Sequence, residues 1–109
     1  MITKIIKRDG REAKFDTEKI TQAIYKAAQA IGGNDYDAAK ALSVQVRDLL
    51  EKKCGDKAPT VEQVQDAVEK VLIENGHART AKEYILYRAE RTRVREMNTK
   101  LMKIYEDLT

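Results

Sequence analysis

The chain has few of the residues that build covalent or metal-bound frameworks. Its 109 residues include a single cysteine and a single histidine, which excludes an internal disulfide and a multi-cysteine zinc site. Cys54 and His77 are weak candidates for catalysis, and we interpret them as filler and as a loop residue. The sequence also lacks a glycine-rich phosphate loop and a dinucleotide-binding fingerprint. Any nucleotide site must therefore rest on cationic side chains and on the exposed backbone of a strand.

Long apolar runs are missing as well. No stretch approaches the roughly 18 consecutive apolar residues that a membrane-spanning helix needs, and the first residues lead into a charged strand rather than a signal peptide. We therefore expect a cytoplasmic chain without a membrane partner. The length suits one small domain with its own core, and no internal repeat or low-complexity linker divides it.

Charge is abundant, but its two signs nearly balance. The net charge of +3 is too small to indicate nucleic-acid binding by itself, so we expect no nucleic-acid partner. Residues 1–26 hold seven of the 21 cationic and four of the 18 anionic side chains, which leaves equal numbers of each sign in the rest. The positive excess therefore lies wholly in the N-terminal quarter.

The stretch from Lys4 to Lys14 predicts a β-hairpin. Asp9 and Gly10 lie between two short extended runs, and a tight hairpin turn needs positive φ, which these residue types tolerate. Lys7 and Arg8 would then stand at the end of the first strand, beside the turn.

A helix beginning at Thr17 is predicted next, with Asp16 as its N-cap. Lys19 falls in its first turn, where the helix dipole favours an anion. Lys7, Arg8 and Lys19 would converge near this helix N-terminus and suit a polyphosphate. From charge alone, a solvated basic face is the more common explanation of such a cluster.

Two helices follow the hairpin, because the apolar period changes from two to 3.6. The first ends at the glycine pair 32–33, and the second is capped by Asn34 or Asp35 and stops at Gly55. The side chains expected to face the core from these helices are Ile20, Ala23, Ile24, Ala27, Ala28, Ile31, Ala38, Ala41, Leu42, Gln45, Val46, Leu49 and Leu50.

Capping boxes predict two further helices. One runs from Thr60, and the segment 57–59 before it could add a strand beside the hairpin, as an edge because of its proline. The other runs from Thr80 with Glu83 at its third helical position. The expected core side chains are Val61, Val64, Val68, Val71, Leu72, Ala81, Tyr84, Ile85, Arg88 and Ala89.

The last helix continues as an apolar heptad seam to the end of the chain. Such a helix would fold back on the bundle, pair with another copy, or belong to a longer protein. The predicted fold class is thus α+β and mostly helical, a four-helix bundle capped by a small two- or three-stranded β-sheet. The seam residues are Val94, Met97, Leu101, Ile104 and Leu108.

Arginines form a second basic set on this helix. Arg93 and Arg95 are interpreted as a surface paired with nearby glutamates. Arg88 lies on the stripe of Tyr84, where a partly buried guanidinium wants an anion that a phosphate could supply. Tyr84 and Tyr87 either pack the bundle or offer a ring on which a base stacks.

Two separate motifs resemble the ATP-cone family. The first comprises residues 5–11 and 15–20, and the second comprises residues 61–69 and 81–88. They recur in order and at the expected spacing, and the resemblance covers about residues 2–95. The tail from Arg95 to Thr109 is similar to the segment after the cone in anaerobic (class III) ribonucleoside-triphosphate reductases.

The resemblance implies a regulatory nucleotide-binding domain at residues 1–95 and a C-terminal extension at 96–109 that leads to a catalytic domain. It would bind ATP as activator and dATP as inhibitor, with Mg²⁺ on the phosphates, and would control overall reductase activity. The reductase's catalytic residues are not in this chain, so we expect no enzymatic activity from it alone. The implied partners are the parent catalytic domain and further copies in a nucleotide-dependent homo-oligomer.

The resemblance also implies the nucleotide-binding residues. A contact from the start of the third helix falls at Thr60 or Val61, and a fourth-helix cation at Arg88 or Arg91. Ala13 stands where some reductase cones carry an acidic residue, so a ribose contact is not carried over there. The full set is Ile6, Lys7, Arg8, Lys19, Thr60, Val61, Arg88 and Arg91.

Two other functions compete with this hypothesis. One is the sensor half of a nucleotide-controlled transcriptional repressor, which would carry a cysteine-rich zinc ribbon before the cone. A sequence that begins at the hairpin and contains only Cys54 argues against it. The other is a helical interaction module whose basic hairpin is merely solvated, and a ligand-induced thermal shift would separate it from a nucleotide sensor.

Overall fold

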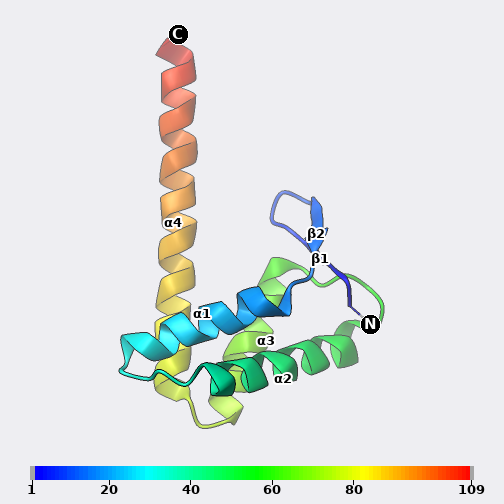
Figure 1. Ribbon diagram of the computed structural model, residues 1–109. Coiled ribbons are helices and arrows are strands. Elements are labelled where there is room, and N and C mark those ends of the chain that lie inside the picture. The colour runs from blue at the N-terminus through cyan, green and yellow to red at the C-terminus, as the bar shows by residue number, and fades with distance from the viewer. Residues whose placement is uncertain (1, 109) are drawn as a thin grey trace.

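Within residues 2–108, the part of the chain that the computed structural model describes, a two-stranded hairpin precedes four helices (Figure 1). The side chains at 92, 95, 99, 101, 102 and 104–108 lie outside that part. The arrangement confirms the mostly helical α+β prediction. The elements are β1 (Lys4–Ile6), β2 (Glu12–Lys14), α1 (Thr17–Ala30), α2 (Tyr36–Cys54), α3 (Val61–Glu74) and α4 (Ala78–Leu108).

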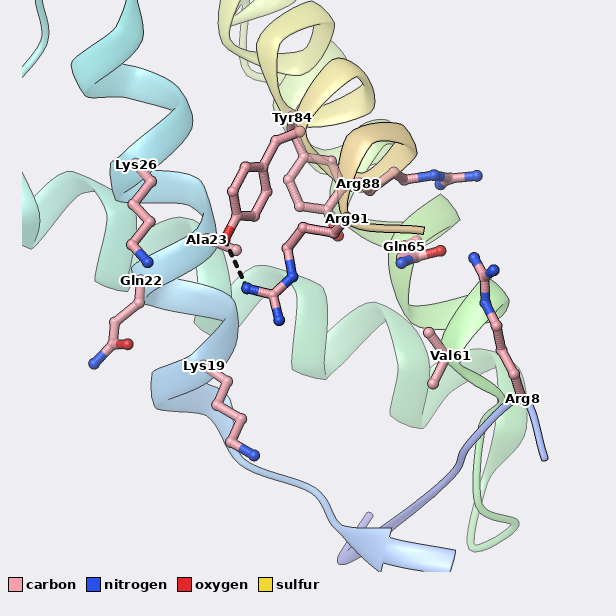
Figure 2. A pocket seen from close by; sticks show the side chains of 11 residues that line it. Arg8, Lys19, Gln22, Ala23, Lys26, Val61, Gln65, Tyr84, Arg88 and Arg91 are labelled. Atoms are coloured by element: carbon pink, nitrogen blue, oxygen red, sulfur yellow. Dashed lines mark hydrogen bonds between the residues drawn. The ribbon is translucent and has the colours of Figure 1, made fainter. Parts of the chain in front are cut away.

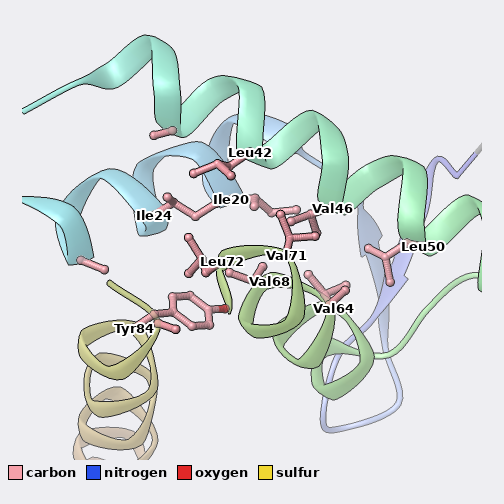
Figure 3. Close-up of a cluster of buried hydrophobic side chains, with 14 of the residues drawn as sticks. Ile20, Ile24, Leu42, Val46, Leu50, Val64, Val68, Val71, Leu72 and Tyr84 are labelled. Atoms are coloured by element: carbon pink, nitrogen blue, oxygen red, sulfur yellow. The ribbon is translucent and has the colours of Figure 1, made fainter. Parts of the chain in front are cut away.

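The core lies where the four helices meet. α1 packs against α2 and α4, and α3 packs against the same two helices. Figure 3 shows Ile24, Leu72 and Tyr84 converging there from three different helices. Most predicted core positions are buried: Ile20, Ile24, Ala27, Leu42, Val46, Leu50, Val64, Val68, Val71, Leu72, Ala81 and Tyr84. The predicted positions Ala23, Ala28, Ile31, Leu49, Val61 and Arg88 are half-buried. Ala89, also predicted to face the core, is exposed.

The predicted face of α2 was wrong at three positions. Ala38, Ala41 and Gln45 are exposed, whereas Ala39 and Ser43 are buried. The helix packs against α1 on one side and α3 on the other, so two neighbours rather than the apolar period alone set its buried stripe. A serine fits this stripe because its hydroxyl finds a hydrogen-bond partner inside.

That partner is a threonine that the apolar pattern also missed. Thr21 on α1 and Ser43 on α2 are each at most 1% exposed, and their hydroxyl oxygens are 2.7 Å apart. Each hydroxyl also lies within donating distance of a carbonyl of its own helix, that of Thr17 or Lys40. With one proton each, one hydroxyl can donate to its carbonyl while the other donates to its neighbour. The buried polar atoms are thus satisfied where α1 crosses α2.

The start of α4 was also predicted wrongly. The helix begins at Ala78, and the carbonyl of His77 already accepts from the amide of Ala81 at 2.9 Å. Thr80 is therefore not a cap but a buried residue of the first turn, 5% exposed. Ile85, predicted to face the core, is 41% exposed because α4 turns Ala81 and Tyr84 inward instead.

The second half of α4 does not fold back on the bundle. The helix is continuous to Leu108 and extends far beyond the other elements (Figure 1). Val94 and Met97 of the predicted seam are exposed on it, and the side chains of Leu101, Ile104 and Leu108 lie outside the described residues. No helix in the described range is long and apolar enough to cross a membrane.

The hairpin forms as predicted, but its turn differs. Ile6 pairs with Glu12, the carbonyl of Lys7 accepts from the amide of Gly10 at 2.9 Å, and the amide of Lys7 donates to Arg11 at 2.8 Å. Gly10 has φ +85°, whereas no non-glycine residue among those described has positive φ. This is a three-residue loop, residues 8–10, closed by a left-handed glycine. Arg8 therefore lies inside the loop, and Lys7 lies at its edge.

The possible third strand is reduced to one bridge. Ile6 pairs in parallel with Thr60, and its amide donates to the carbonyl of Pro59 at 2.9 Å. Proline has no amide hydrogen to extend a ladder, and α3 begins at the very next residue, Val61. Among the described residues the sheet therefore has two strands, and the bridge holds the hairpin against the start of α3.

Candidate functional site

A pocket of about 420 Å³ lies between α1, α3 and α4, next to the hairpin turn (Figure 2). Five of its lining side chains are cationic and none is a carboxylate. The pocket thus gathers positive charge from parts of the chain that are distant in sequence. The lining residues are Arg8, Lys19, Gln22, Ala23, Lys26, Val61, Gln65, Tyr84, Tyr87, Arg88 and Arg91.

α1 supplies one wall through residues spaced three, four and seven apart. Asp16 caps the helix by accepting from the amide of Glu18 at 3.0 Å, as predicted. This cap fixes the helix start, so Lys19 lies in the first turn and Lys26 lies two turns later on the same face. Both lysines line the pocket, and Gln22 lies between them.

α3 places its first residues at the opposite wall. The predicted capping box is present: the amide of Gln63 donates to the Thr60 hydroxyl at 3.2 Å, and the amide of Thr60 donates to the Gln63 side chain at 2.9 Å. Val61 and Gln65 follow on the pocket side. The side-chain oxygen of Gln65 is buried and has no hydrogen-bond partner among the described residues. A buried acceptor without a donor is costly, so this oxygen is suited to a donor from a ligand.

The hairpin turn brings Arg8 to the pocket. The Ile6 bridge to Thr60 fixes the turn beside α3, and the Nε of Arg8 lies 3.4 Å from a carboxylate oxygen of Glu62. Both side chains are about half exposed, at 44% and 54%. The arginine is therefore held toward α3 and remains accessible to solvent.

Other hairpin cations are paired away from the pocket. Asp9 accepts from the amide of Arg11 at 3.1 Å and from its Nε at 2.6 Å, and these hydrogen bonds hold the pKa of Asp9 below its ordinary value. Lys4 lies 3.3 Å from Glu12. The positive excess of the hairpin therefore reaches the pocket mainly through Arg8.

α4 carries two arginines with different surroundings. Arg88 donates to Glu69 at 2.5 Å and lies 3.7 Å from Asp66, so α3 supplies the anion that its half-buried position needs. Arg91 stacks over the ring of Tyr87 at 5.8 Å and donates to its hydroxyl at 3.2 Å. Figure 2 shows the Arg91 guanidinium turned toward α1 and Arg88 pointing the opposite way.

The two tyrosines that line the pocket, Tyr84 and Tyr87, also have different surroundings. Burial raises the pKa of Tyr84 to about 12, and the residue is 6% exposed, which confirms it as a core residue. Tyr87 is less buried, and the hydrogen bond from Arg91 lowers its pKa, with the charge of Lys26 acting in the same direction. A stacking role for a base is open to Tyr87 and closed to Tyr84.

The structure brings five of the eight predicted site residues to the pocket: Arg8, Lys19, Val61, Arg88 and Arg91. Ile6 and Thr60 form the bridge at its edge, and Lys7 is exposed in the turn. Arg93, farther along α4, lies 3.7 Å from Glu90, as the salt-bridged surface predicted, and the side chain of Arg95 is outside the described residues.

Sequence reasoning missed three polar lining residues: Gln22, Lys26 and Gln65. The spacing of seven between Lys19 and Lys26 was a usable signal, because it places both on one helix face. Nothing in the sequence pattern distinguished Gln65 from other surface glutamines. The charge of the finished pocket suits a polyanion, and no carboxylate of the described residues pairs with Lys19, Lys26 or Arg91.

Comparison with known proteins gives concordant results. Residues 3–93 match the family model described as ATP cone domain. The chain is 40% identical over 99% of its length to a vitamin B12-dependent ribonucleoside-diphosphate reductase of Thermoplasma acidophilum. It is 39% identical over 84% to a ribonucleoside-diphosphate reductase subunit alpha of Chlamydia muridarum, and 32% over 95% to an anaerobic ribonucleoside-triphosphate reductase of Haemophilus influenzae. It spans only 14%, 10% and 15% of these proteins.

Proposed function

The chain belongs to the ATP-cone family, and we propose that it binds ATP as activator and dATP as inhibitor to control the overall activity of a ribonucleotide reductase. The observation that carries the proposal is the pocket with five cations and no carboxylate in its lining. A nucleoside triphosphate supplies the matching negative charge. The reductases named above support this reading over a repressor or a ligand-free helical module.

The pocket suggests a division of labour among its cations. Lys19, Lys26 and Arg91 form no ion pair with a described carboxylate, so they are ready to receive phosphates. Arg8 reaches the pocket from the turn. Arg88 contributes positive potential, but its guanidinium is already occupied by Glu69. We therefore assign the direct α4 contact to Arg91.

The nucleoside end of the ligand would use the remaining groups. The unpartnered side-chain oxygen of Gln65 would accept from a donor of the base or ribose. Ile6, Thr60 and Val61, at the junction of hairpin and α3, would contact the nucleotide through backbone and apolar surface, and Lys7 would join the phosphates from the turn. Among the described residues no group of three or more His, Cys, Asp or Glu could hold a metal, so Mg²⁺ would be held chiefly by the phosphates.

The relatives extend far beyond the length of this chain, and from this we propose a catalytic domain as its partner. The cone would comprise residues 1–95, and the rest of α4, residues 96–109, would lead to that domain. The anaerobic type named in the sequence analysis is one of three reductase types among the relatives, beside a B12-dependent enzyme and a subunit alpha. Association of further copies under nucleotide control belongs to the same proposal.

Thermal unfolding with and without ATP–Mg²⁺ tests nucleotide binding. A ligand at 100 times its Kd should add about 2.7 kcal/mol to the free energy of unfolding, with dATP giving a comparable shift. The Lys19→Ala/Arg91→Ala double variant is the control, because it keeps the core and removes two pocket cations that form no ion pair with a described carboxylate. An unchanged melting temperature at millimolar nucleotide, or an equal shift in the control, would overturn the proposed site.

A further inference from the structure

Three acidic side chains form a stripe along one face of α3. Glu62, Asp66 and Glu69 are spaced four and three residues apart, which places them on the same side of the helix. The stripe runs beside Val61 and Gln65, the two α3 residues that line the pocket. Carboxylates therefore lie on the same helix as two residues of this cationic pocket, although none of them lines it.

The acidic stripe forms ion pairs with Arg8 and Arg88, and the two pairs differ in distance and in exposure to solvent. Glu69 receives Arg88 at 2.5 Å, with side chains only 22% and 29% exposed. Glu62 receives Arg8 at 3.4 Å, with side chains 54% and 44% exposed. The first pair is mostly removed from water and expensive to separate. The second is a solvated pair between a turn and a helix N-terminus, and separating it costs little.

We propose that Glu62 is an internal competitor for Arg8. In the ligand-free chain the Glu62 carboxylate forms an ion pair with the Arg8 guanidinium. A polyphosphate that enters the pocket displaces this carboxylate, so that Arg8 pairs with phosphate instead. The inference rests on the proposed nucleotide site and adds a residue that lowers its affinity. After the exchange Glu62 remains in the first turn of α3, where the helix dipole favours an anion.

Breaking the Arg8–Glu62 ion pair should lower the affinity for the ligand by a measurable amount. A solvated ion pair contributes about 0.2–1 kcal/mol, which corresponds to at most about fivefold in an equilibrium constant. Glu62→Gln removes the competing charge and keeps the shape of the side chain. We expect it to tighten ATP–Mg²⁺ and inorganic tripolyphosphate by about 1.4- to fivefold. Tripolyphosphate isolates the phosphate part of the ligand.

The matched control is Glu12→Gln in the same hairpin. Glu12 pairs with Lys4 at 3.3 Å with similar exposure and does not line the pocket. The Glu12→Gln variant removes one negative charge, as Glu62→Gln does, and leaves the Arg8–Glu62 ion pair intact. An effect of net charge alone would therefore appear equally in both variants. A second control is the Arg8→Ala background, in which Glu62→Gln should no longer change affinity.

Isothermal titration of these variants decides the matter. A gain in Glu62→Gln that exceeds Glu12→Gln and vanishes without Arg8 is the expected result. Equal affinities of Glu62→Gln and the parent sequence would overturn the competitor while leaving the nucleotide site standing, as would equal gains in both single variants. Failure of the parent sequence to bind either probe would instead remove the proposed function, and the competitor with it.

Discussion

Arg88 of α4 donates to a carboxylate oxygen of Glu69 on α3 at 2.5 Å, and together they tie the long helix to the body of the domain. Because both side chains are mostly buried, removing Glu69 leaves Arg88 with little water around it and only the more distant, exposed Asp66 as a partner. We expect Glu69→Leu to lower the free energy of unfolding by about 1–3 kcal/mol, less than for a fully buried pair. Urea denaturation measures it.

The control for that prediction removes both charges at once. Arg88→Met combined with Glu69→Leu replaces the pair by apolar side chains of similar volume, and much of the lost stability should return. A double variant as unstable as Glu69→Leu alone would mean that packing, and not the unpaired charge, caused the loss.

Lys19→Ala should weaken ATP and dATP by about 1–3 kcal/mol, the range for a charge-assisted hydrogen bond. The fold should persist, because Lys19 is exposed in the first turn of α1 and contributes little to the helix. Lys14→Ala removes an exposed lysine that does not line the pocket and should bind normally. Isothermal titration that finds unchanged affinity for Lys19→Ala would exclude this side chain from the site.

Gly10→Val should lower both stability and nucleotide binding. The residue has φ +85° with nothing near its missing side chain, so the cost of about 1–3 kcal/mol is backbone strain alone. Gly32→Val imposes the same strain at φ +89°, after α1 and outside the pocket. Both variants should melt earlier, and only Gly10→Val should lose ATP affinity beyond its loss of fold. Normal binding by folded Gly10→Val would show that the turn does not shape the site.

Tyr84 should make the domain less stable in strong alkali. Burial raises its folded pKa to about 12 from 10, so between these values the unfolded chain loses a proton that the folded chain keeps. Its contribution is complete below pH 10 and is lost as pH rises toward 12, about 2–3 kcal/mol over the window. Tyr84→Phe should flatten this part of the curve. An equal alkaline loss in the variant would assign it to other groups.

ATP and dATP should act on the parent protein in opposite directions. They differ by one 2′-hydroxyl, and a ligand shifts a conformational equilibrium only by its differential affinity for the two states. We expect dATP to favour one association of the parent chain and ATP another, with α4 leading from the pocket toward the partner. Light scattering at matched saturation measures the masses. Identical masses and identical activities with both nucleotides would leave a passive binding module.

Local chemistry explains which parts of the structure were predictable. The caps at Asp16 and Thr60 and the hairpin around Gly10 depend on residues within a few positions of each other, so the sequence pattern was sufficient. The buried face of α2 depends on helices on both sides, and it was misplaced by one residue at Ala39 and Ser43.

The residues of the pocket likewise include some that were predictable from local sequence and some that were not. Lys19 and Arg8 were recognisable because a helix start and a turn present them. The pairing of Arg88 with Glu69 depends on how α3 and α4 are rotated against each other, and neither the period nor the spacing of the sequence specifies that rotation. The burial of the Gln65 side-chain oxygen, which has no hydrogen-bond partner among the described residues, likewise arises only in the assembled fold.

The bridge between Ile6 and Thr60 governs when the hairpin can form. Strands of three residues are too short to persist alone in water, so β1 and β2 depend on docking against the start of α3. Docking closes a loop that contains all of α1 and α2, and contacts this distant along the chain are made slowly. A molecule in which the start of α3 has not yet docked against β1 therefore lacks the fixed turn that carries Arg8, and with it a complete ligand site.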